Sequence, residues 1–115
     1  MSLPVLVKTL VEKKIDAFCK KRVSPRVADK LRLSFLIRGK SVTIFENRAP
    51  WRPEFTEWTS MAIAQLRHDE KTGKWTLYWA DRNDRWHKYE DPPPTKEIDH
   101  ILAEIDRDPT GIFWG

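Results

Sequence analysis

The chain has 115 residues, of which 40% are hydrophobic and 33% charged, and its formal net charge is +4. It is too rich in aromatic and apolar residues for a disordered tail, and no apolar run approaches the ~20 residues that a membrane-spanning helix needs. A chain of this size buries about two-thirds of its unfolded surface in one core. We therefore predict a single domain over residues 1–115.

Charge is divided unevenly along the chain. Residues 1–52 contain 13 Lys/Arg and 4 Asp/Glu, whereas residues 53–115 contain 8 and 13, so that the halves carry +9 and −5. A basic half suggests an acidic partner such as nucleic acid. The alternative is that the two halves neutralise each other in the folded protein.

Cys19 is the only cysteine, which excludes an intrachain disulfide and a cysteine-rich metal site. A lone cysteine fits a reducing compartment. The first residues also lack the basic and then apolar order of a secretory signal. We expect a cytoplasmic protein that does not act at a membrane.

Residues 6–22 repeat their apolar residues at helical spacing, which predicts an amphipathic helix. Its apolar side consists of Val7, Leu10, Val11, Ile15 and Phe18. The opposite side is rich in lysine, and we expect it to be solvated, with a membrane surface or nucleic acid as the alternatives.

Residues 31–48 alternate with period two on either side of Gly39-Lys40, which predicts a hairpin with a two-residue turn. This turn pairs Ile37 with Val42 and Phe35 with Ile44. One face then carries Leu33, Phe35, Ile37, Val42 and Ile44, and the other carries Arg32, Ser34, Leu36, Arg38, Thr43, Phe45 and Asn47.

Three further strands are predicted at about 58–69, 74–80 and 85–90, joined by four-residue loops at 70–73 and 81–84. This register places Trp79 opposite Trp86. The apolar face consists of Ala62, Ala64, Leu66, Trp75, Leu77, Trp79 and Trp86. The reverse face consists of Met61, Ile63, Gln65, Arg67, Thr76, Tyr78, Arg85, His87 and Tyr89.

After the prolines at 92–94, Thr95 is placed to cap a second helix that ends before Pro109. Its apolar stripe is Ile98, Ile101, Leu102 and Ile105. The predicted fold is α+β: an N-terminal helix, a five-stranded antiparallel sheet of two plus three strands and a C-terminal helix, with both helices on one sheet face and the other face open.

The middle of the chain resembles a known family. The resemblance lies within Val42 to Glu90, in the segments VTIFENRAPWRPEFTEW and KWTLYWADRNDRWHKYE. Its motifs are the Pro-Trp loop, the Trp-x-Leu-Tyr-Trp strand and the Trp-His-x-Tyr ending. They resemble a mostly bacterial family catalogued as domain of unknown function 3024. The resemblance implies one compact bacterial domain and carries no activity with it.

The open face is the first candidate site, and single-stranded nucleic acid is the first candidate ligand. Arginines neutralise phosphates, while tyrosine and histidine rings stack on unpaired bases. The candidate residues are Arg32, Arg38, Arg67, Tyr78, Arg85, His87 and Tyr89. A solvated face without a ligand is the alternative, because antiparallel sheets commonly leave one face to water.

A second hypothesis is a protein-interaction module or homodimer. The Pro-Trp loop offers Trp51, and the C-terminal tail offers Ile112, Phe113 and Trp114 unless these dock on their own domain. The basic sheet face would then have no ligand of its own.

No catalytic motif points to an enzyme. The histidines and Cys19 lack ligand spacing, and there is no Gly-rich phosphate loop or nucleophile motif. We expect no cofactor and no metal. A metal-dependent nuclease is a third possibility, and its ligands would be Glu46, Glu54, Asp81 and Asp84, although aspartates beside a turn are favoured for turn geometry alone.

Overall fold

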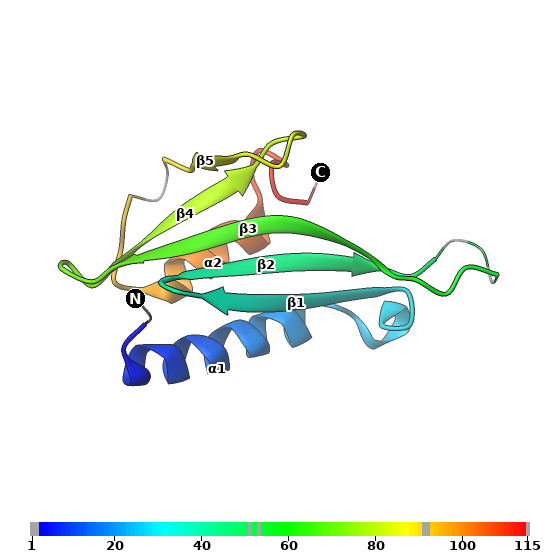
Figure 1. Cartoon of the computed structure of the whole chain (residues 1–115), viewed down its shortest axis with the longest axis horizontal. Coiled ribbons are helices and arrows are strands. Elements are labelled where there is room, and N and C mark those ends of the chain that lie inside the picture. Colours follow the sequence, from blue (N-terminus) through cyan, green and yellow to red (C-terminus); the bar gives the residue numbers. More distant parts are fainter. Residues whose placement is uncertain (1–2, 51, 53, 91–92, 115) are drawn as a thin grey trace.

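The structure is a computed structural model that describes residues 3–50, 52, 54–90 and 93–114. The strands form one antiparallel sheet in the order β1-β2-β3-β4-β5, so each strand lies beside the next one in the chain (Figure 1). The elements are α1 (Val5–Arg22), the short 3-10 helix η1 (Pro25–Val27), β1 (Leu31–Arg38), β2 (Ser41–Arg48), β3 (Thr59–Asp69), β4 (Lys74–Ala80), β5 (Trp86–Lys88) and α2 (Ile98–Arg107). The predicted α+β fold is confirmed.

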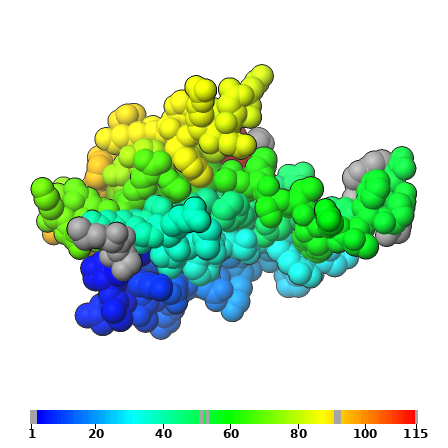
Figure 2. Space-filling view, viewed as in Figure 1, coloured from blue at the N-terminus to red at the C-terminus, as the bar shows by residue number. Residues whose placement is uncertain are grey.

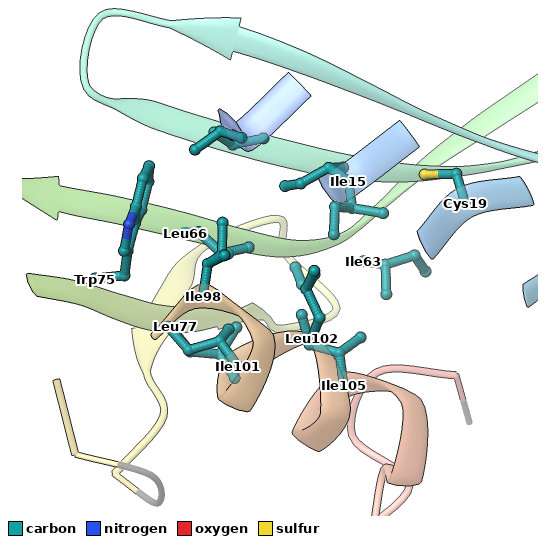
Figure 3. Close-up of a cluster of buried hydrophobic side chains, with 14 of the residues drawn as sticks. Ile15, Cys19, Ile63, Leu66, Trp75, Leu77, Ile98, Ile101, Leu102 and Ile105 are labelled. Carbon is teal, nitrogen blue, oxygen red and sulfur yellow. The ribbon is translucent and has the colours of Figure 1, made fainter. Parts of the chain in front are cut away.

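Both helices pack against the same face of the sheet, where the core lies (Figure 3). α1 contributes Val11, Ile15 and Cys19, and α2 contributes its whole apolar stripe. Burying one such Ile or Leu side chain stabilises the fold by roughly 1.5–3 kcal/mol. The prediction that Leu10 belongs to the buried side was wrong, since its side chain is 51% exposed. The buried stripe of α1 follows Val11, Ile15 and Cys19 at intervals of four residues, and Leu10 lies beside this stripe.

The first hairpin has the predicted two-residue turn and register. Ile37 pairs with Val42 and Phe35 with Ile44. Gly39 takes a φ of 59°, a conformation that costs glycine little because it has no Cβ. The alternating pattern then turns the predicted apolar face, Leu33, Phe35, Ile37, Val42 and Ile44, toward the helices.

A β-bulge in β3 changes which side chains face the core. Ile44 pairs with Ala64, but Phe45 pairs with Ala62, so Ile63 is the extra residue. Ile63 is 3% exposed and joins the core. The predictions that placed Ala62 on the core face and Ile63 on the open face were therefore wrong. Met61, predicted on the open face, also lies on the helix side. The cause is the bulge, which shifts the alternation of side chains by one residue.

The turn between β4 and β5 is also one residue out of the predicted register. The N–H of Asp81 donates to the carbonyl of Arg85, and Asp84 takes a φ of 60°. This is the pattern of a three-residue turn with a left-handed last residue. Consequently Trp79 pairs with His87. The predicted pairing of Trp79 with Trp86 was wrong.

The C-terminal segment folds back onto the domain. Thr95 lies outside α2 in a β-bridge with Trp75, so its predicted capping role was wrong; its hydroxyl accepts instead from the N–H of Glu97 (3.0 Å). Beyond α2, the carboxylate of Asp108 accepts from the N–H groups of Phe113 (3.1 Å) and Trp114 (2.9 Å). Neither helix of the described chain is long and apolar enough to span a membrane.

Candidate nucleic-acid interface

The sheet face opposite the helices, hereafter the open face, is formed by the outward positions of all five strands (Figure 2). The ladder pairings assign these positions to Arg32, Ser34, Leu36, Arg38, Ser41, Thr43, Phe45, Asn47, Ser60, Ala62, Gln65, Arg67, Asp69, Lys74, Thr76, Tyr78, Ala80, Trp86 and Lys88. Aromatic and cationic side chains are interleaved on this face.

Cations outnumber acids on the open face. The basic side chains are Arg32, Arg38, Arg67, Lys74 and Lys88, and Asp69 is the acid among the outward strand positions. Within the described residues, none of these cations forms an ion pair. Their charge is therefore not neutralised by a carboxylate of the protein.

Arg67 is held in a fixed orientation on the middle strand, two residues before the end of β3. Its guanidinium carbon lies 3.8 Å from the centre of the Tyr78 ring, and its Nε donates to Oε1 of Gln65 (2.7 Å). The amide of Gln65 in turn donates to the hydroxyl of Thr43 (2.9 Å). Side chains ordered in this way lose little entropy when a ligand binds.

A shallow hollow of about 290 Å³ lies beside this network. Phe45 and Trp86 bound it on two sides, and Ala62 and Ala80 lie between them, because Phe45 pairs with Ala62 and Ala80 pairs with Trp86. The two methyl side chains leave the space between the aromatic rings open. Trp86 reaches this position only because of the short turn before β5.

The candidate residues from the sequence divide into three groups. Arg32, Arg38, Arg67 and Tyr78 lie on the open face, and Arg85 lies in the β4–β5 turn. His87 and Tyr89 belong to the helix side, so their predicted placement was wrong. Phe45, Trp86 and Lys88 were missing from the candidate set, although the predicted hairpin register already turned Phe45 outward.

His87 and Tyr89 both have structural partners. The His87 ring stacks on Trp79 at 4.6 Å, and its Nε2 lies 2.7 Å from Asp81. This hydrogen bond, together with the N–H groups of the turn, lowers the pKa of Asp81 to about 2. The Tyr89 hydroxyl donates to buried Glu104 (2.7 Å), and this bond lowers the pKa of Glu104 even though burial opposes the shift.

The residues of the alternative partner site are largely engaged. Phe113 is 4% exposed, and the indole N–H of Trp114 donates to the carbonyl of Ile105 (2.7 Å) while Arg22 lies over its ring. Ile112 also packs against the core. Trp51 lies outside the described residues. The tail therefore docks on its own domain.

The four carboxylates of the nuclease hypothesis do not gather. Glu46 pairs with Arg48, Glu54 with Arg52, and Asp81 with His87, while Asp84 lies in the β4–β5 turn. In the part of the chain that the structure describes, no three His, Cys, Asp or Glu side chains come together as metal ligands would. This geometry gives a metal-dependent nuclease no support.

Comparison with known proteins gives a family and no activity. A family model described as "Domain of unknown function (DUF3024)" matches residues 3–115. The match extends beyond the middle segment that carried the resemblance and includes both helices. No curated protein and no solved structure matches the chain significantly.

Proposed function

The chain belongs to the DUF3024 family, and from this premise we propose that it is a non-enzymatic module that binds single-stranded nucleic acid on the open face. The observation that carries the proposal is the set of cations without ion pairs on the open face, interleaved with the aromatic rings of Phe45 and Trp86. Phosphates need the cations, and unpaired bases need exposed ring faces. A reducing bacterial cytoplasm, which suits a lone buried cysteine, is the setting that we propose.

The sheet favours single strands over duplex. Base stacking on an aromatic side chain contributes ~1–3 kcal/mol per base and requires bases that are not already paired. Reading duplex DNA requires an element that enters a groove, usually a helix. Both helices here pack on the core face, opposite the candidate interface; in Figure 1, α2 lies behind the sheet and α1 runs below β1.

Fluorescence anisotropy with labelled single-stranded RNA, single-stranded DNA and duplex DNA tests the proposal. We expect tighter binding to single strands, and we expect the Arg38→Glu, Arg67→Glu double variant to lose it. The matched control is Lys8→Glu, Lys13→Glu, which changes the net charge equally on exposed positions of α1. Equal loss in both variants, or no binding by the unaltered protein at low salt, would contradict the proposal.

A protein partner is the second candidate, and it now depends on the loop between β2 and β3. This loop projects from one end of the molecule (Figure 1). Phe55 and Met61 near it are 49% and 53% exposed, and Trp58 is 36% exposed. Binding through these side chains would persist at high salt, because apolar burial is not screened. A Phe55→Ser variant should abolish such binding and leave the oligonucleotide titrations unchanged.

A further inference from the structure

We infer that the hollow between Phe45 and Trp86 is a subsite for one base of the bound strand, and that it prefers guanine. This inference rests on the proposed function and adds a base identity to it. The inference follows from the shape of the hollow and from the two charged side chains that line it, Arg38 and Asp84.

The shape suits one flat ring system. Phe45 is on β2 and Trp86 on β5, so three strand spacings, or ~14 Å, separate their backbones, and both side chains line the space between. Ala62 and Ala80 form an apolar floor between them. A base that lies on these methyl groups contacts an aromatic side chain at each end, and its edges point toward the polar lining.

The carboxylate of Asp84 indicates which kind of ligand group the hollow accepts. Among the described residues its side chain makes neither a hydrogen bond nor an ion pair, whereas the neighbouring Asp81 is fully engaged in the turn. A free carboxylate beside a phosphate-binding surface repels phosphates. It becomes favourable where a base presents N–H donors to it.

Guanine is the base that satisfies both charged groups together. Its N1–H and N2–H₂ groups form a double donor edge that matches a carboxylate, and its O6 and N7 form the double acceptor edge that a guanidinium binds in bidentate fashion. Arg38 and Asp84 come from opposite ends of the sheet, β1 and the β4–β5 turn, and line the same hollow. Adenine and cytosine offer only one of these paired edges at most.

The test uses a labelled oligothymidylate with one central base replaced by guanine, hypoxanthine, adenine or cytosine. We expect the guanine strand to bind roughly tenfold more tightly than the adenine strand, within the range that a good bidentate contact provides. Hypoxanthine lacks the N2 amino group and should lose part of this preference.

Asp84→Asn is the matched variant, because asparagine also tolerates the positive φ at this position and keeps the side-chain shape. It should remove the preference for guanine and leave the affinity for plain oligothymidylate unchanged or higher. Ala62→Leu, which fills the floor, should abolish the preference as well.

Failure of the guanine subsite can be distinguished from failure of single-strand binding. Equal binding of all four strands, or a preference for guanine that survives Asp84→Asn, would overturn the guanine subsite while single-strand binding stands. Failure of every strand to bind at low salt would overturn both the subsite and the proposed function.

Discussion

Cys19 has its thiol in the core between α1 and the sheet. Burial, and next the charge of Asp16, raise the pKa of this thiol from 9.0 to about 11. At pH 8 the thiolate is therefore roughly a hundredfold scarcer than in the unfolded chain. We expect an aromatic disulfide reagent to label Cys19 at least that much more slowly in buffer than in concentrated urea, and equal rates would contradict a buried thiol.

Tyr89 links the end of the sheet to α2 through its hydrogen bond to Glu104. Replacing Tyr89 by Phe should lower the free energy of unfolding by about 1.5–3 kcal/mol at pH 7, the range for a hydrogen bond to a charged group. Because the pKa of Glu104 is lower in the folded state, its contribution is present above the unfolded value and is lost as the pH falls through the folded one. Urea denaturation should therefore show a large difference between the two proteins at pH 7 and a smaller one in acid.

The β4–β5 turn is held by one side chain. The Asp81 carboxylate accepts from the N–H groups of Asn83 (2.8 Å) and Arg85 (3.0 Å) and bonds to His87. Asp81→Asn should weaken all three contacts, and we expect faster hydrogen exchange at the amides of Asn83 and Arg85. In the unaltered protein the same protection should disappear as the pH falls toward 2, where Asp81 becomes protonated. Asp84→Asn is the control, because its side chain makes no hydrogen bond in the turn among the described residues.

The first hairpin could be predicted from sequence because a Gly-Lys pair separates two cleanly alternating runs. The bulge could not, since Ala62, Ile63 and Ala64 are all apolar and any of them could face the core without breaking the pattern. The β4–β5 turn was mispredicted because an aspartate, Asp84, occupies the left-handed position where glycine is usual. The shift at this turn moved Trp86 onto the open face and removed His87 and Tyr89 from it, and the bulge moved Ala62 onto it. Two of the seven candidate residues were therefore misplaced by details that alternation does not encode.

For the whole molecule, the uneven charge is neutralised only in part. Basic α1 meets acidic α2 through the pairs Lys14–Asp99 and Arg22–Asp106. The halves of the chain thus neutralise each other between the helices. The cations of β1, β3, β4 and β5 on the open face are left without such partners among the described residues. The outward strand positions of the open face therefore keep a net positive charge.

The salt dependence of binding tests how many of these cations contact phosphates. If about four cations of the open face contact phosphates, the logarithm of the binding constant should fall against the logarithm of salt with a slope of roughly −3, at ~0.7 per phosphate for single strands. Arg38→Glu, Arg67→Glu should at least halve the slope, whereas Lys8→Glu, Lys13→Glu should leave it unchanged. A slope near zero in the unaltered protein would rule out phosphate contacts as the main source of affinity.

The order of the strands also makes the fold divisible. A cut in the turn at 70–73 would leave one fragment with α1 and β1 to β3, and another with β4, β5 and α2. Along the described chain, the β3–β4 ladder, the shared core and the ion pairs between α1 and α2 would hold these halves together. We expect the two fragments to reassemble when produced together, as their co-purification would show. The domain could then serve as a split reporter, whose two fragments reconstitute the fold only where they are brought together.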